Sequence, residues 1–91
     1  MIVMLCRNWV ADFTKWKAVF DSHAAAHRAA GLNLRGLWQE LGDPKHVFFL
    51  FEVSSLEKAR AFISDPAAAE AGRASRVQEG EYHFLESIEG Y

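Results

Sequence analysis

Residues 46–53 have the sequence HVFFLFEV, and this stretch limits the folds that are open to the chain. Apolar side chains run from Val47 to Phe51 without interruption, so they fill both alternating sets of positions. A strand of an antiparallel sheet with one wet face alternates apolar and polar side chains. This stretch does not alternate, and we therefore expect a strand whose two faces are both covered.

The residues before this stretch predict its partner strand. Residues 32–41 (LNLRGLWQEL) form a second apolar-rich run, and Gly42-Asp43-Pro44 separates the two runs. Glycine, aspartate and proline in succession are typical of a tight turn. The two runs are therefore predicted to form an antiparallel hairpin.

The segment before the hairpin predicts a long amphipathic helix. Asp12 suits the N-cap, because its carboxylate can accept hydrogen bonds from free amides of the first turn. Gly31 is typical of the position just after a helix, so we expect the helix to run from Asp12 to about Ala30. At the helical spacing one face carries Phe13, Trp16, Phe20, His23, His27 and Ala30.

The segment after the hairpin predicts a second helical region and a final strand. Ser54 and Glu57 fit a capping box, which would begin a helix that runs through about Ile63. The elements expected after it are a short helix from Asp65-Pro66 to about residues 72–76, a loop at 77–80 and a strand at 81–88 (EYHFLESI).

Residues 2–10 (IVMLCRNWV) add a first strand, and the order becomes βαββαβ. This order predicts one α+β domain over residues 1–91, with a ferredoxin-like four-stranded antiparallel sheet. Right-handed crossovers place both helical segments on one sheet face. No third helical layer is expected to cover the other face, so we expect a second copy of the chain to cover it and form a homodimer.

Composition excludes several classes of partner. Lys and Arg number 10 against 12 Asp and Glu, and no basic stripe supports a nucleic-acid partner. The apolar run from Ile2 to Leu5 is too short for a membrane span, so no membrane partner is expected. Cys6 is the only cysteine, which favours a reducing compartment and thus a cytoplasmic location.

His23 and His27 are the residues that point most directly to chemistry. They are four positions apart on the apolar helix face, so their side chains should lie one above the other. Three interpretations stay open: catalytic acid–base groups in a ligand cavity, metal ligands, or packed histidines bonded to backbone or water. A metal site needs a third ligand, and the glutamate that follows the first histidine in zincins is missing because Ala24 follows His23, so no metal is predicted.

Four further residues are candidates for binding a substrate. Asn8 is a polar residue on a strand that we expect to be covered, where it is either a local hydrogen bonder or a site residue. The aromatic candidates are Trp16, Phe20 and Trp38, although large aromatic side chains serve cores and dimer contacts as well. His46 lies beside the predicted turn, and we expect it to be exposed.

Several stretches resemble one group of proteins over nearly the whole chain. These stretches are Asp12-Phe13-Thr14-Lys15-Trp16-Lys17, Phe20-Asp21-Ser22-His23, Ala30-Gly31, Leu50-Phe51-Glu52-Val53, Leu56-Glu57-Lys58-Ala59-Arg60-Ala61-Phe62 and Ser64-Asp65-Pro66. In them the chain resembles the dimeric α/β-barrel superfamily, and within it the proteins similar to antibiotic-biosynthesis monooxygenases and cyclase-like proteins.

The resemblance implies a homodimer whose two sheets form a barrel, with a cavity that binds small aromatic, polyketide-like or quinol-like molecules. Some members of the superfamily oxidise such molecules with oxygen and no cofactor, and none is expected here. Haem-degrading members use an asparagine on the first strand, which Asn8 could match, with a tryptophan and a histidine further on. Residues 55–76 contain neither, which argues against haem degradation.

The sequence leaves two classes of function open. One is a cofactor-free monooxygenase or cyclase that acts on a small aromatic substrate, with His23 and His27 as its acid–base groups. The other is a non-catalytic structural or binding dimer, since a fold by itself does not imply a function. The sequence does not decide whether the protein is an enzyme.

Overall fold

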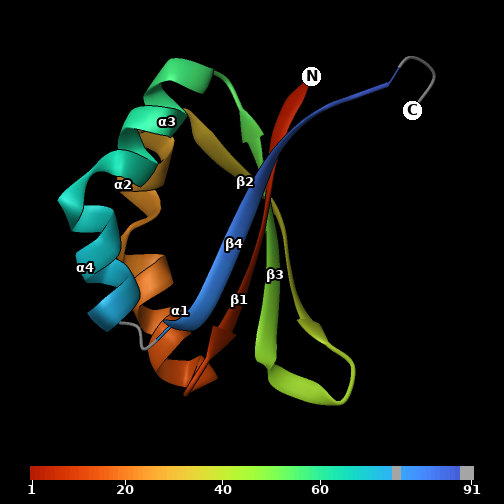
Figure 1. The fold of residues 1–91 in the computed structure, drawn as a ribbon, viewed down its shortest axis with the longest axis vertical. Helices are drawn as coiled ribbons and strands as arrows, with labels where there is room; N and C mark the ends of the chain where they lie inside the picture. Colours follow the sequence, from red (N-terminus) through yellow and green to blue (C-terminus); the bar gives the residue numbers. More distant parts are fainter. Residues whose placement is uncertain (75–76, 89–91) are drawn as a thin grey trace.

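The computed structural model describes residues 1–74 and 77–88, which form a layer of helices on one face of a sheet (Figure 1). The elements in chain order are β1 (Ile2–Val10), α1 (Phe13–Ser22), α2 (Ala24–Ala29), β2 (Leu32–Glu40), β3 (Asp43–Val53), α3 (Leu56–Ser64), α4 (Pro66–Ala74) and β4 (Val77–Glu86). The four strands lie in the order β2-β3-β1-β4, and each neighbouring pair is antiparallel. The predicted ferredoxin-like α+β fold is confirmed. No helix of the described residues is long and apolar enough to cross a membrane.

The register of β1 against β3 determines which side chains face the helices. Cys6 pairs with Phe49, and both are buried in the core between helices and sheet. Leu5 and Leu50 are the next residues along their strands, so they point to the opposite face. They pair directly with each other there, because paired residues point to the same side of a sheet. The uninterrupted apolar run in β3 therefore supplies both faces, as its sequence predicts.

The helix predicted over 12–30 is wrong in one respect, because it is divided at His23 into α1 and α2. The His23 amide donates to the Phe20 carbonyl at 3.1 Å, one residue short of the α-helical spacing. The Val19 carbonyl accepts instead from the Ser22 hydroxyl at 2.6 Å, and it lies 2.8 Å from His23 Nδ1. Side chains that compete for a backbone carbonyl in this way interrupt a helix locally.

The predicted helix ends agree with the structure at one helix and differ at the next. The Asp12 carboxylate accepts from the Lys15 amide at 3.1 Å, and Gly31 adopts a positive φ of 74° just after α2. The cap of α3 is Ser55, whose hydroxyl accepts from the Lys58 amide at 3.2 Å. The capping box predicted from Ser54 is wrong, because the Ser54 hydroxyl donates to the Gly31 carbonyl at 3.3 Å.

Two strands are longer than their sequences predict. β4 begins at Val77, and its residues 77–80, which we expected to form a loop, pair with β1 from Val10 back to Asn8. β3 begins at Asp43, inside the predicted turn. Backbone pairing along an edge strand does not need apolar side chains, and the polar residues of 78–81 therefore gave no strand signal.

Candidate functional site

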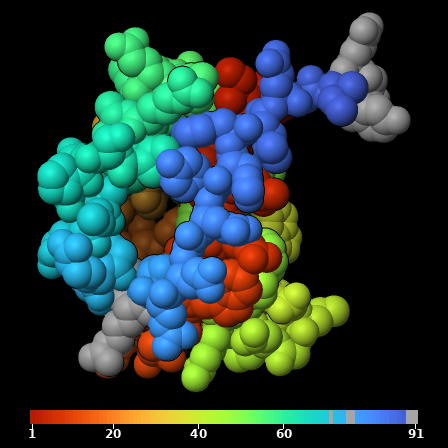
Figure 2. Space-filling view, viewed as in Figure 1, coloured from red at the N-terminus to blue at the C-terminus, as the bar shows by residue number. Residues whose placement is uncertain are grey.

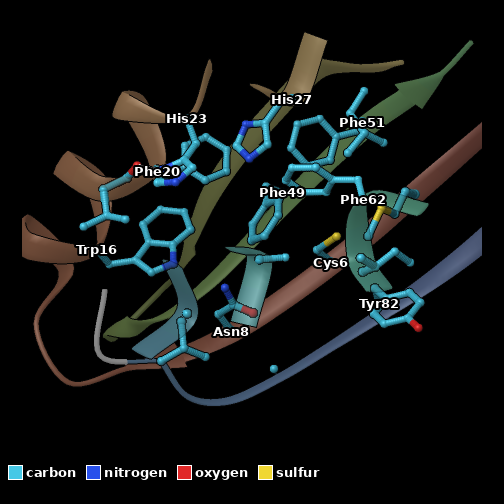
Figure 3. Close-up of a pocket in the computed structure, with 18 of the residues that line it drawn as sticks. Cys6, Asn8, Trp16, Phe20, His23, His27, Phe49, Phe51, Phe62 and Tyr82 are labelled. Atoms are coloured by element: carbon cyan, nitrogen blue, oxygen red, sulfur yellow. Dashed lines mark hydrogen bonds between the residues drawn. The ribbon is translucent and has the colours of Figure 1, made fainter. Parts of the chain in front are cut away.

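A cavity of about 480 Å³ lies between the helices and the sheet (Figure 3). Figure 2 shows a hollow in the surface between α4 and β4. The labelled side chains around the cavity are Cys6, Asn8, Trp16, Phe20, His23, His27, Phe49, Phe51, Phe62 and Tyr82. Five of the six residues predicted for the site are among them, namely Asn8, Trp16, Phe20, His23 and His27. Its walls are mainly aromatic, which suits a planar apolar ligand.

Trp16 forms one wall and is held on both sides. Its side chain is buried and stacks on Phe20, with ring centroids 4.8 Å apart. In the orientation of the Asn8 amide that satisfies its neighbours, the amide oxygen accepts from the Trp16 indole Nε1 at 3.2 Å. The amide nitrogen donates to the Arg7 carbonyl at 2.9 Å. The amide group of Asn8 therefore holds the Trp16 indole in place through a hydrogen bond.

Gly80 on β4 makes room for this arrangement. A Cβ atom at this position would lie 2.7 Å from the end of the Asn8 side chain, closer than real contacts allow. Gly80 faces Asn8 across the β1–β4 pair and also lines the cavity. A glycine is therefore needed here to leave the asparagine in contact with Trp16.

His27 lies in a cage of aromatic rings. Its centroid is 5.1 Å from that of Phe20, 5.1 Å from that of Phe51 and 5.6 Å from that of Phe62. Burial lowers the pKa of His27, and the positive charge of a protonated His23 lowers it further. No hydrogen bond engages the His27 ring within the described part of the chain. A neutral imidazole with both nitrogens available therefore borders the cavity.

His23 has a defined tautomer at the break between α1 and α2. A carbonyl oxygen only accepts, so His23 Nδ1 carries the proton that points to the Val19 oxygen, 2.8 Å away. The Ser22 hydroxyl lies 3.1 Å from the same nitrogen. In the neutral ring Nε2 is then the nitrogen with the lone pair. The ring centroids of His23 and His27 are 6.4 Å apart, so one site contains two imidazoles.

Cys6 lines the cavity floor but is not a nucleophile. Burial raises the pKa of its thiol to about 12. The thiolate is the reactive form of cysteine, and it is scarce at neutral pH when the pKa is this high. Cys6 therefore contributes to the apolar wall.

Among the wall residues that were not predicted as site residues are three aromatic side chains of the strands, namely Phe49, Phe51 and Tyr82. The apolar run of β3 showed that both faces would be covered, but it could not show which parity faces the helices. Tyr82 comes from β4, where it pairs with Cys6 and so points to the same side. The direct strand pairs supply the signal that the sequence alone lacked.

Trp38 lies apart from the other predicted site residues. It pairs with Phe48 on the sheet face away from the helices and is 52% exposed. Its ring lies over Gly36, where a Cβ would come within 2.1 Å of an indole carbon. Trp38 therefore belongs to the outer face, and the cavity described above does not include it.

A separate group of titratable side chains lies at the β2–β3 hairpin. His46 is only 6% exposed, so its expected exposure is wrong, and it stacks on Trp9 with centroids 4.1 Å apart. Its Nδ1 lies 3.0 Å from the Glu40 carboxylate, and candidate ligand atoms of Glu40, Asp43 and His46 all lie within 4.8 Å of one another. The pairing with Glu40 ties the two strands of the hairpin together.

Comparison with solved structures places this fold among known proteins. Over 100% of this chain and 96% of the other, it matches a candidate antibiotic biosynthesis monooxygenase from Deinococcus radiodurans, with a TM-score of 0.75 and 15% identity. The match to SnoaB, a cofactor-independent oxygenase from Streptomyces nogalater, covers 94% and 91% with a TM-score of 0.75 and 16% identity. An uncharacterized NIPSNAP domain protein from Burkholderia xenovorans matches over 100% and 98%, with a TM-score of 0.69 and 18% identity.

These matches show that the chain has the fold of the antibiotic biosynthesis monooxygenase and NIPSNAP proteins over its full length. No protein-family model matches the sequence. No curated protein matches it either. At these identities the likeness establishes the fold and leaves the activity to the site.

Proposed function

We propose that the protein is a homodimer that binds a small planar aromatic molecule in the helix–sheet cavity and removes a proton from it. The observation that carries this proposal is His27. Its neutral imidazole lies in a cage of aromatic rings, free of hydrogen bonds to the described residues, with a lowered pKa. A histidine that stays neutral at physiological pH is suited to act as a general base.

Proton removal is the step shared by the two reactions that the fold's resemblance suggests. In an oxygenase, the carbanion of an acidic CH2 group supplies electrons to O2, and the balance is CH2 plus O2 giving C=O plus H2O. In a cyclase, the same carbanion attacks a carbonyl carbon, a new C–C bond replaces the C–O π bond, and the resulting alkoxide oxygen takes up the proton that the base removed. The likeness in fold to SnoaB, a cofactor-independent oxygenase, supports the first route.

The other cavity residues have supporting roles in this proposal. Trp16 and Phe20 provide flat surfaces for the ring of the ligand, and Asn8 keeps the Trp16 indole in place. His23, with its proton on Nδ1 directed at Val19, has its second nitrogen left to accept a proton. The mostly apolar wall strengthens each polar contact, because apolar side chains lower the local dielectric constant.

Binding and turnover of anthrone, which has an acidic CH2 group, test this proposal. Calorimetry should give saturable binding, and an oxygen electrode should record oxygen uptake. We expect His27→Gln to lower kcat about 100- to 10,000-fold, the usual contribution of a general base, with little change in affinity. Lys15→Gln changes an exposed residue of α1 that lines neither cavity and should behave as wild type. Binding with no oxygen uptake would contradict the oxygenase route, and absence of binding would overturn the proposed ligand site and favour a non-catalytic structural dimer.

The second copy in this proposal covers the outer face of the sheet. Leu5, Phe48 and Leu50 present apolar groups there, and Trp38 and Leu85 are 52% and 44% exposed. Two ion pairs lie on this face, since Arg7 Nε lies 2.6 Å from the Glu81 carboxylate and Arg35 contacts Glu52. An apolar face whose arginines are neutralised in this way suits burial against a copy of itself.

Sedimentation velocity tests the dimer separately from the chemistry. Wild-type protein should sediment as a dimer of about twice the 10.3 kDa chain mass. We expect Leu50→Glu to give monomers, because it places a charge in the proposed interface. Glu57→Gln on exposed α3 is the control and should leave the dimer intact. A monomeric wild type would contradict this part of the proposal.

A further inference from the structure

A second cavity of about 330 Å³ adjoins the first. It lies where α1 and α2 meet β2, and it shares four wall residues with the first cavity, namely Phe20, His27, Leu32 and Phe51. The two cavities are therefore back to back with common walls. His27 borders both, so a ligand with one part in each cavity would lie beside this imidazole.

The second cavity has an arginine among its lining residues, while no described lining residue of the first is an arginine or a lysine. Asp21 in the second cavity is paired with Lys17 at an oxygen–nitrogen distance of 2.6 Å. Arg28 lines the same cavity, and within residues 1–74 and 77–88 no acidic side chain pairs with it. The second cavity therefore has one uncompensated positive charge.

The polar groups around this charge suit an anion. Asn33 lines the same cavity and adds an amide group. A guanidinium group presents parallel N–H donors that fit the two oxygens of a carboxylate. Carboxylate burial needs such compensation, which the first cavity does not offer.

We propose that the second cavity binds the carboxylate of the same ligand whose aromatic ring occupies the first. The inference rests on the proposed function and names its substrate class, an aromatic compound with a short acidic side chain. Arg28 then determines specificity for the acid, while the walls of the first cavity bind the ring. His27 lies between the two parts of the ligand.

A matched pair of ligands separates ring binding from carboxylate binding. 6-Hydroxy-2-naphthaleneacetic acid and its methyl ester share the ring and differ in charge. By calorimetry at low salt we expect wild-type protein to bind the acid roughly three- to tenfold more tightly than the ester, because the Arg28 side chain is partly solvated. The preference should decrease at high salt, as screening increases.

Arg28→Gln should abolish the preference and leave binding of the ester unchanged. Lys15→Gln removes the same charge from an exposed position of α1 that lines neither cavity, and it should keep the preference. Equal affinities of wild-type protein for acid and ester would overturn the inference while the proposed function stands. A preference that survives in Arg28→Gln would do the same. If neither compound binds, the proposed function fails together with the inference.

Discussion

The Asn8 amide oxygen accepts a hydrogen bond from the indole N–H of Trp16, and Trp16→Phe removes this donor. The substitution therefore tests the contact that holds one wall of the cavity. A neutral hydrogen bond contributes about 0.5–1.5 kcal/mol net, and a buried partner left unpaired costs about 1–3 kcal/mol. Trp16 is 2% exposed, so its substitution also leaves a small void. We expect Trp16→Phe to destabilise the protein by about 2–3 kcal/mol and Asn8→Ala by about 1–2 kcal/mol.

The double variant decides whether the two side chains act together. Once either partner is gone, removing the other costs less, so the double variant should lose about 1 kcal/mol less than the sum of the single changes. Urea unfolding followed by circular dichroism measures all four free energies independently of tryptophan fluorescence. Trp38→Phe on the outer face, combined with Asn8→Ala, is the control and should be additive. A coupling below about 0.3 kcal/mol between Trp16 and Asn8 would refute the assigned hydrogen bond.

Three further predictions follow from single sites. Because its pKa is lowered on folding, His27 binds a proton more readily in the unfolded chain, so the free energy of unfolding should fall as the pH drops below neutrality. Urea titrations at pH 7 and pH 5.5 should show a smaller difference for His27→Phe than for wild type. An equal difference in both proteins would contradict this prediction. The pKa of the Cys6 thiol is about 12 in the folded protein, against 9.0 for an ordinary thiol. Iodoacetamide at pH 8 should therefore alkylate Cys6 roughly a thousandfold more slowly in native protein than in urea. Equal rates would refute its burial. Ser55→Ala should cost about 1 kcal/mol of unfolding free energy and exceed the loss from Ser54→Ala, whereas the reverse order would return the α3 cap to Ser54.

The order of elements was predictable because the first helical region and the hairpin turn have strong local signals at their boundaries. Asp12 and Gly31 define the ends of the first helical region through backbone requirements that few other residues meet. The glycine of the hairpin turn likewise adopts a positive φ, which at Gly42 is 81°. Such signals depend on one or two residues, so they can be identified without knowledge of the tertiary packing.

The face on which a strand residue lies was less predictable, because both faces of this sheet are apolar. Alternation then gives two parities of equal hydrophobicity, and only contact with the helices distinguishes them. Trp38 shows the difficulty. Counting by twos from Leu32 places it on the helix side, but the register of β2 shifts between Leu34 and Gly36 and turns it outward. An extra residue in one strand reverses the parity of every residue after it.

The break at His23 connects the local sequence to the proposed chemistry. In an uninterrupted helix the His23 amide would bond to the Val19 carbonyl, and that carbonyl would be less available to the imidazole. Because the amide bonds to Phe20 instead, Val19 is left to accept from Ser22 and from His23 Nδ1. The proton of the neutral ring is thereby assigned to Nδ1, and the lone pair to Nε2. The irregularity that sequence periodicity could not predict is thus the feature that decides which nitrogen of His23 can accept a proton.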